Sequence, residues 1–353
     1  MIYLKNKIEN MKTRFLMLLA FVVVFAACEN QENDFDDFGS TAVYFPFQTP
    51  ARTIIQGRYD LGINENDNNQ KFEISLTMGG VFTNDVNRRV GFRLAPELLS
   101  DVENVTELPQ NYYTIETESP VTIPSGSIKG KISVQLTDAF FDDPLSFAGD
   151  NDVHYVVPLK ITNYENLDSL LTGVKLVDNP IKIRDEDWDP LPKDYTLFGI
   201  KFMNEYQGIY LRRGADVMTN GAGEVTTSEY RAEFIERDEL TNLTTTGRSN
   251  VSYINRVRRG ELNSPGDVSI ELLFSSDDTC TVVSSGDDPY NVSGSGRFVE
   301  DGDEWGGERR NVIYLDYTYT DAVNSETHAV RDTLVIRNRD VKFEEFTVEL
   351  TGL

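Results

Sequence analysis

The sequence has few of the residues that carry most protein chemistry, with two histidines and two cysteines among 353 residues. His154 and His328 occupy separate strand-like segments, and neither stands at metal-ligand spacing from a cysteine or another histidine. There is no Gly-x-Ser-x-Gly nucleophile motif, and no Gly-Lys-Ser/Thr phosphate loop follows the glycine-rich stretch 293–296. These absences argue against an enzyme and predict neither a cofactor nor a bound metal.

Positive charge is also scarce. Lysine and arginine total 33 against 58 acidic residues, which gives a formal net charge of -25. Such a surface repels a phosphate backbone, so nucleic acid is excluded as a partner. The cysteines do not predict a disulfide, because Cys28 ends a hydrophobic segment. Cys280 remains alone in a strand pattern, where we expect a buried, inert thiol.

A short hydrophobic segment near the start predicts export. Lys12 and Arg14 precede the apolar run 15–27, which is too short to span a bilayer core comfortably and has the length of a signal peptide. Translation from either Met1 or Met11 preserves this pattern. The run ends in Phe-Ala-Ala followed by Cys28, which resembles the lipobox of bacterial lipoproteins. We therefore predict a signal peptide over 1–27, lipidation of Cys28 and an acidic flexible tether over 28–40.

Strand patterns fill the rest of the chain. Alternation such as that of Phe72, Ile74, Leu76 and Met78 recurs in seven short segments, which favours an immunoglobulin-like β-sandwich over 41–178. Prolines and acidic residues in 179–193 indicate a linker. Eight to ten further strands in 194–353 predict an antiparallel β-barrel, with a second sandwich as the alternative. The expected fold class is all-β.

Exposed aromatic residues are the best candidates for ligand contact. Sugar rings have apolar faces and polar edges, so their sites combine aromatic faces with polar side chains. The candidate residues lie in acidic or glycine-rich loops, beside turns, or next to such aromatic residues. They are Trp188, Trp305, Tyr206, Tyr210, Tyr290, Arg212 and Asp303.

Two other readings of the acidic loops remain open. Asp303 and Glu304 beside Trp305 could supply a glycosidase pair, although 58 acidic residues single out no pair. The stretches 60–68 and 150–152 offer oxygen ligands for Ca²⁺ but lack the EF-hand register.

Several long blocks resemble a Bacteroidota lipoprotein family of unknown function. The resemblance covers nearly the whole mature chain and is carried by the segments 44–60, 71–81, 108–114, 134–141, 192–201 and 210–214. It implies an N-terminal immunoglobulin-like module, a separate C-terminal β domain and an association with polysaccharide-utilisation loci. It also implies a gene encoded near starch-utilisation-type outer-membrane transporters, among components whose non-enzymatic lipoproteins hold glycans at the cell surface.

The leading hypothesis is therefore a non-enzymatic lipoprotein of the outer membrane that faces the cell exterior and binds a polysaccharide or oligosaccharide. The first alternative is a structural or adhesive protein that binds a protein partner, such as an outer-membrane transporter complex. A glycan hydrolase is the second alternative.

Overall fold

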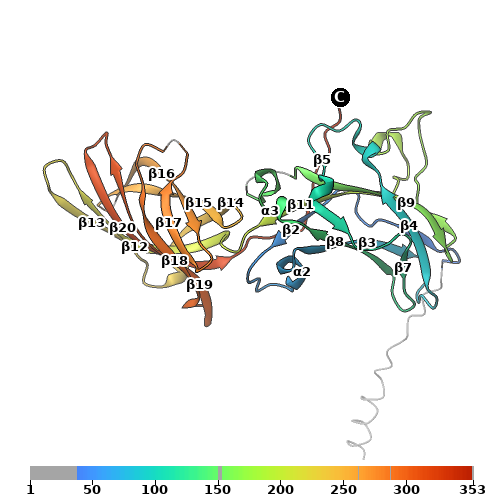
Figure 1. Cartoon of the computed structure of the whole chain (residues 1–353), viewed down its shortest axis with the longest axis horizontal. Coiled ribbons are helices and arrows are strands. Elements are labelled where there is room, and N and C mark those ends of the chain that lie inside the picture. Colours follow the sequence, from blue (N-terminus) through green and yellow to red (C-terminus); the bar gives the residue numbers. More distant parts are fainter. Residues whose placement is uncertain (1–37, 150–152, 261, 287, 352–353) are drawn as a thin grey trace, which may run out of the picture.

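The computed structural model describes residues 38–149, 153–260, 262–286 and 288–351 and is 53% strand and 8% helix. It contains a β-sandwich and a β-barrel placed end to end along the long axis of the molecule (Figure 1). The predicted signal peptide and Cys28 lie outside the described residues, as does most of the predicted tether.

The first sheet of the sandwich has five strands in the order β10-β1-β3-β8-β6. Its central strands, β3 and β8, pair antiparallel and alternate buried with more exposed side chains, as the period-two pattern predicts. The bounds are β1 (Ala42–Tyr44), β3 (Lys71–Gly79), β6 (Tyr113–Ile115), β8 (Lys129–Leu136) and β10 (Ser169–Leu170).

The second sheet has seven strands. Six follow the order β21-β2-β11-β9-β4-β7, and β5 pairs with β9. The bounds are β2 (Pro50–Ile55), β4 (Arg88–Leu94), β5 (Thr106–Glu107), β7 (Val121–Ile123), β9 (Tyr155–Glu165), β11 (Tyr195–Met203) and β21 (Glu344–Glu345). One hydrophobic core joins the two sheets, with Ile74 and Val134 from the first and Leu159 and Phe202 from the second. This two-sheet arrangement confirms the predicted sandwich.

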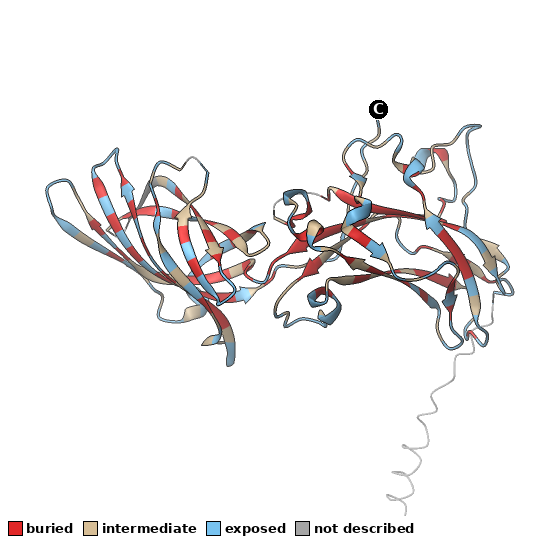
Figure 2. Cartoon of the chain, in the orientation of Figure 1, coloured by how far each residue is buried: buried red, intermediate tan, exposed pale blue. Residues whose placement is uncertain are grey.

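The barrel is closed and has eight strands, which confirms the prediction of a barrel rather than a second sandwich. Closure comes from the antiparallel pairing of β12 with β20, and β13 adds a ninth strand beside the far half of β12. The bounds are β12 (Gly208–Thr219), β13 (Val225–Tyr230), β14 (Glu239–Gly247), β15 (Asn250–Arg259), β16 (Leu262–Phe274), β17 (Thr279–Ser284), β18 (Ser293–Trp305), β19 (Glu308–Asp321) and β20 (Glu326–Asn338). Buried residues alternate with exposed ones along these strands (Figure 2).

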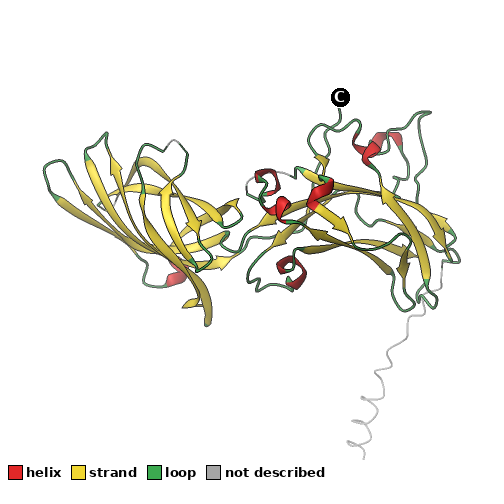
Figure 3. Cartoon of the chain, in the orientation of Figure 1, coloured by secondary structure: helices red, strands yellow, loops and turns green. Residues whose placement is uncertain are grey.

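Helices are short and lie in the connections between strands (Figure 3). They are α2 (Glu65–Asn68), α3 (Asp138–Phe141) and the 3-10 helices η1 (Pro96–Leu99), η2 (Gln110–Tyr112), η3 (Pro144–Ser146), η4 (Asp185–Asp187) and η5 (Ile235–Arg237). Among the described residues, none of the helices has the length and apolar character needed to cross a bilayer.

The boundary between the two bodies lies later in the chain than the sequence indicated. We expected a linker at 179–193 and the second domain from 194, but β11 is an interior strand of the sandwich. It pairs with β9 on one side and β2 on the other. The chain therefore passes into the barrel between Met203 and Gly208. The proline-rich segment is instead a long surface excursion, fixed by a bridge between Lys175 and Trp188.

The chain also returns to the sandwich after the barrel. We call residues 339–351 the C-terminal strap. Its β21 pairs with β2, and Leu350 forms a bridge with Val102. The side-chain amide of Asn104 donates to the carbonyl of Thr347 at 2.8 Å. The sandwich and the barrel are thus joined by two passages of the chain.

Phe202 tests the assignment of β11 to the sandwich. Its ring is fully buried and lies edge-to-face against Phe141, with ring centroids 4.9 Å apart. Phe202→Ala should lower the free energy of unfolding of the sandwich by about 3–5 kcal/mol, because it leaves a cavity there. Hydrogen exchange should then speed up in β9 and β11 but not in β16 or β19. Leu334→Ala, in the barrel core, is the matched control and should give the reverse pattern; equal loss of protection in both bodies for Phe202→Ala would contradict the assignment.

Candidate functional site

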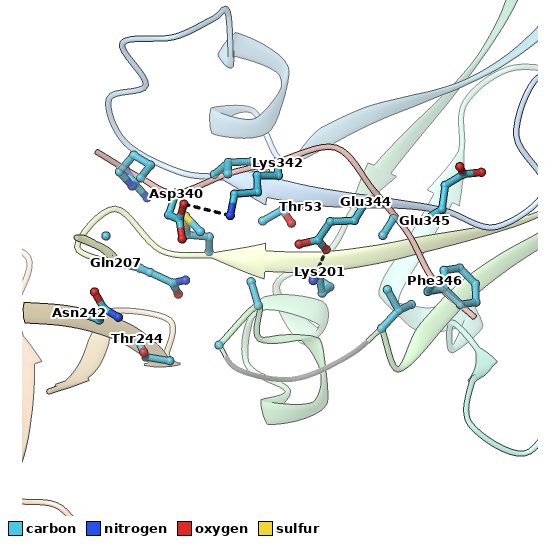
Figure 4. A pocket seen from close by; sticks show the side chains of 18 of the residues that line it. Thr53, Lys201, Gln207, Asn242, Thr244, Asp340, Lys342, Glu344, Glu345 and Phe346 are labelled. Atoms are coloured by element: carbon cyan, nitrogen blue, oxygen red, sulfur yellow. Dashed lines mark hydrogen bonds and ion pairs between the residues drawn. The ribbon is translucent and has the colours of Figure 1, made fainter. Parts of the chain in front are cut away.

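A groove with a volume of about 620 Å³ lies where the sandwich, the barrel and the C-terminal strap meet. Thr53 of β2 and Lys201 of β11 come from the sandwich, while Asn242 and Thr244 come from β14 of the barrel. The strap contributes residues 339–342, 344–347 and 349 along one side, and the close view labels Asp340, Lys342, Glu344, Glu345 and Phe346 among them (Figure 4). Three parts of the chain that are distant in sequence thus build one concave surface.

Two lysine–carboxylate pairs lie along the strap side of this groove. The ammonium of Lys201 is 2.7 Å from a carboxylate oxygen of Glu344, and the Lys201 side chain is only 11% exposed. Lys342 lies 3.6 Å from Asp340, and both of these side chains are largely exposed. Each lysine therefore faces a carboxylate, and Glu345 and Glu349 add further negative charge. The groove has no excess of positive charge that would select an anionic ligand.

The barrel side of the groove carries amides and a hydroxyl. Figure 4 shows Gln207, Asn242 and Thr244 grouped across the groove from Asp340. The amide oxygen of Gln207 accepts the backbone N–H of Thr245 at 2.9 Å, which fixes this side chain. Phe346 lies at the other end and supplies an apolar face. This combination suits a ligand with many hydroxyl groups and small apolar faces.

Arg339 holds the strap at the start of the groove. Its guanidinium is buried and donates to the backbone carbonyls of Gln56 at 3.1 Å, Arg58 at 3.2 Å and Asn204 at 2.5 Å. Burial lowers the pKa of Arg339 from its ordinary value, although an arginine stays charged. The barrel end of the strap is thus tied to the ends of β2 and β11 in the sandwich.

Three of the residues predicted to bind ligand are instead core residues of the barrel. Tyr206 is 3% exposed and stacks on Phe274 with ring centroids 3.7 Å apart. Tyr210 is fully buried and donates its hydroxyl to the carbonyl of Tyr206 at 2.8 Å. Arg212, 1% exposed, points into the barrel as well. The prediction that these side chains form an exposed binding face was wrong, because alternation along β12 turns residues 210 and 212 inward.

Arg212 belongs to a buried polar network. Its guanidinium donates to Asp332 at 2.8 Å and to Asn255 at 2.7 Å, and the hydroxyl of Tyr317 donates to Asp332 at 3.1 Å. Burial opposes the charge on Arg212, but the Asp332 carboxylate outweighs it and raises the pKa of Arg212. Burial and the same carboxylate raise the pKa of Tyr317, so its hydroxyl stays protonated and donates. Side chains fill this part of the barrel interior.

The two tryptophans lie apart from the groove. The indole N–H of Trp188 donates to the carbonyl of Ile181 at 2.9 Å, and the ammonium of Lys182 lies 4.6 Å from its ring centroid. Trp305 ends β18, where the guanidinium of Arg310 is 5.2 Å from its ring. Each ring thus has one face occupied by a cation of the same chain.

The remaining candidates do not gather around the groove either. Asp303 accepts the backbone N–H of its neighbour Glu304 at 2.8 Å in the β18–β19 hairpin. Tyr290 is half-buried and meets Tyr319 edge-on at 6.0 Å. Cys28 lies outside the described residues. Cys280 is buried, as expected, and burial raises the pKa of its thiol to about 12.

One groove residue, Lys201, carries a signal that is visible in the sequence. Lys201 interrupts the otherwise apolar and aromatic end of β11, between Ile200 and Phe202. A lysine in a strand that is buried along its length needs a partner, which Glu344 supplies from the strap. Asn242, Thr244 and Gln207 carry no comparable signal, because polar residues are common in strands and turns at a protein surface.

Comparison with known proteins places this architecture in a family. Residues 205–340, the span of the barrel, match a model described as a domain of unknown function (DUF5627), and residues 35–168 match a model described as an N-terminal domain. A crystal structure of a Bacteroides ovatus protein of unknown function is 33% identical, with a TM-score of 0.81. The match covers 90% of this chain and 100% of that chain. The chain belongs to the family of this Bacteroides ovatus protein.

This result confirms the resemblance to a Bacteroidota family of unknown function. More distant structures include a multidomain Bacteroides ovatus protein with a DUF1735 domain, 13% identical with a TM-score of 0.39 over 88% of this chain and 99% of that chain. Another is an auxiliary nutrient binding protein from Bacteroides thetaiotaomicron, 12% identical with a TM-score of 0.38 over 83% of this chain and 95% of that chain. No curated protein matches the chain.

The buried network of the barrel makes a stability prediction. Arg212→Met should destabilise the barrel by about 3–5 kcal/mol, because it leaves the Asp332 carboxylate buried without its cation. Arg331→Met is the matched control: its side chain is 83% exposed and pairs with Asp316, so the loss should stay below about 1 kcal/mol. Urea unfolding measures both values. Equal effects of the two substitutions would contradict a structural role for the network.

Proposed function

We propose that this chain is a lipid-anchored protein of the outer cell surface that binds an uncharged oligosaccharide or polysaccharide in the groove and leaves it chemically unchanged. The observation that carries the proposal is the groove itself. Amides, a hydroxyl and paired charges from three parts of the chain line one concave surface of about 620 Å³. That volume falls in the range of small-molecule sites and would hold a few sugar rings of a longer chain.

The charges of the groove support an uncharged glycan rather than a sulfated or uronic one. The carboxylates of Glu344 and Asp340 pair with Lys201 and Lys342, and the protein as a whole carries a net charge of -25. An anionic polymer would approach against this field. Hydroxyl groups of a neutral sugar can both donate and accept, so they match amides and carboxylates equally well.

The groove is also shaped before any ligand arrives. Arg339 fixes the start of the strap, and the Lys201–Glu344 pair and the β2–β21 pairing hold the strap further along. A site whose walls are already ordered loses less conformational entropy when it binds. The proposal rests on this geometry together with the lipobox-like sequence that ends in Cys28.

The groove makes a prediction about affinity. Asn242→Ala combined with Thr244→Ala should weaken glycan binding by about 10- to 30-fold, since two hydrogen bonds to sugar hydroxyls are lost. A glycan array with the purified protein would identify the ligand, and titration calorimetry would measure the change. Ser293→Ala with Thr318→Ala, on the outer face of the barrel, is the control and should bind normally.

Two results would contradict this proposal. One is unchanged affinity in the groove variant together with loss of binding in Trp188→Ala or Trp305→Ala, which would move the site to the tryptophans. The other is release of reducing sugar from the bound glycan, which would indicate a hydrolase.

The proposed anchor makes a separate prediction. Cells fed a clickable palmitate should label the native protein but not a Cys28→Ser variant, because the thiol is the attachment point for the diacylglycerol. The native protein should fractionate with the outer membrane and be digested by protease added to intact cells. Absence of label from the native protein, or its recovery from the cytosol, would refute the proposed anchor but would leave the proposal of glycan binding in the groove unaffected.

A further inference from the structure

The end of the sandwich farthest from the barrel carries exposed apolar side chains. We call it the tip, and it consists of residues 38–41 and the loops 80–87, 124–128 and 166–168. Phe38 is 93% exposed, Phe82 74%, Ile128 48% and Val86 47%. The loops are held together by polar contacts: the side-chain amide of Asn84 donates to the carbonyls of Pro124 and Ser127. Apolar side chains thus project from a fixed framework.

The chain enters the described fold at this same tip. The backbone N–H of Phe38 donates to the carbonyl of Gly80 at 3.0 Å. Gly80 has φ +101°, and a Cβ atom there would lie 2.0 Å from the carbonyl oxygen of Ser40. The contact requires glycine, so the entering segment lies directly on the loop that carries Phe82 and Val86. Figure 1 shows this entry point near β7, at the opposite end from the barrel.

The number of residues between Cys28 and the tip limits the distance between the tip and a membrane that holds the lipid chains of Cys28. Phe38 stands ten positions after Cys28, and the apolar run 15–27 comes directly before that cysteine. Ten residues span at most about 35 Å when fully extended. Lipid chains on Cys28 would therefore keep the tip, rather than the barrel, beside the bilayer surface.

The charges of the tip are compatible with a lipid surface although the protein as a whole is strongly acidic. The tip itself carries Asp85 and Asp168. The strand ends beside it add Glu165 at the end of β9, Arg88 and Arg89 at the start of β4 and Lys129 at the start of β8, so acidic and basic residues balance there. This local balance avoids the repulsion that the rest of the protein would meet at an anionic headgroup layer.

We propose that the tip is a membrane-contact surface, which rests its apolar side chains in the headgroup region of the bilayer and fixes the orientation of the anchored protein. This inference rests on the lipid anchor of the proposed function but not on glycan binding. Aromatic and aliphatic side chains at the tip would bury their apolar area at the interface, adding to the hold of the lipid chains.

Spin labels on the full-length lipidated chain test the proposal. One label is placed at the tip through Thr83→Cys and one at the far hairpin of the barrel through Ala222→Cys; both positions are exposed, and the native Cys280 is buried. The protein is reconstituted in vesicles of phosphatidylethanolamine and phosphatidylglycerol. For the label at the tip, the ratio of its collision rate with oxygen to its collision rate with a water-soluble nickel chelate should be several-fold higher in vesicles than in water. The barrel label should show no such change.

Substitutions at the tip complete the test. Val86→Asp with Ile128→Asp should return the Thr83→Cys label to water, whereas Val225→Asp with Ile254→Asp, at exposed apolar positions of the barrel, should leave it unchanged. The proposal is overturned if the tip label on lipidated protein stays as accessible to nickel as the barrel label. It is equally overturned if the spectra of the tip labels are broadened by spin–spin interaction in the absence of lipid. That result would show that the tip is a contact surface between two copies of the chain. A chain shown by mass spectrometry to carry no lipid would refute the anchor itself.

Discussion

The relative placement of the sandwich, the barrel and the C-terminal strap depends on a buried cation, the guanidinium of Arg339. Among the described residues, the guanidinium of Arg339 pairs with no carboxylate and instead donates to the backbone carbonyls of Gln56, Arg58 and Asn204, which lie just after β2 and β11. Because Arg339 is also the first residue after β20, this interaction fixes the sandwich, the barrel and the strap relative to one another. The groove takes its walls from those three parts, so its shape depends on these contacts of Arg339, together with the Lys201–Glu344 pair and the β2–β21 pairing farther along the strap.

The barrel contributes a wall to the groove rather than a container for a ligand. An eight-stranded barrel is just wide enough for side chains to fill. Here one part of the interior is occupied by aromatic residues such as Tyr206 and Phe274, and another by the ion pair of Arg212 with Asp332 and its hydroxyl donors. A buried pair of this kind is costly to desolvate and is stable only when its donors and acceptors are satisfied. The proposed ligand recognition therefore involves the outside of the barrel and its junction with the sandwich.

Period-two alternation was enough to predict the strands, the sandwich and the barrel, because half-buried strands such as β3 show it directly. It failed for β11, whose residues are buried on both faces and whose sequence does not say which sheet it joins. Alternation places Tyr210 and Arg212 on the same face of β12, but the apolar residues Ile209, Leu211 and Val217 lie on the other face, so the sequence pattern alone does not predict that Arg212 points into the barrel. The groove could not be predicted from the sequence, because its residues are brought together only by the fold. They include Thr53, Lys201, Asn242 and Asp340.

The positions of the tip and the groove would give the sandwich a mechanical role in the anchored protein. Strand β9 runs from Glu165, near the tip, to Tyr155, which pairs with Ile200 beside the groove residue Lys201. Its 11 residues correspond to roughly 36 Å of strand. With the tip on the bilayer, the sandwich would act as a rigid spacer that lifts the groove clear of the headgroups. The barrel would lie farther out still, as the order of the parts in Figure 1 implies. A bulky polysaccharide could then reach the groove from the side without first approaching the membrane.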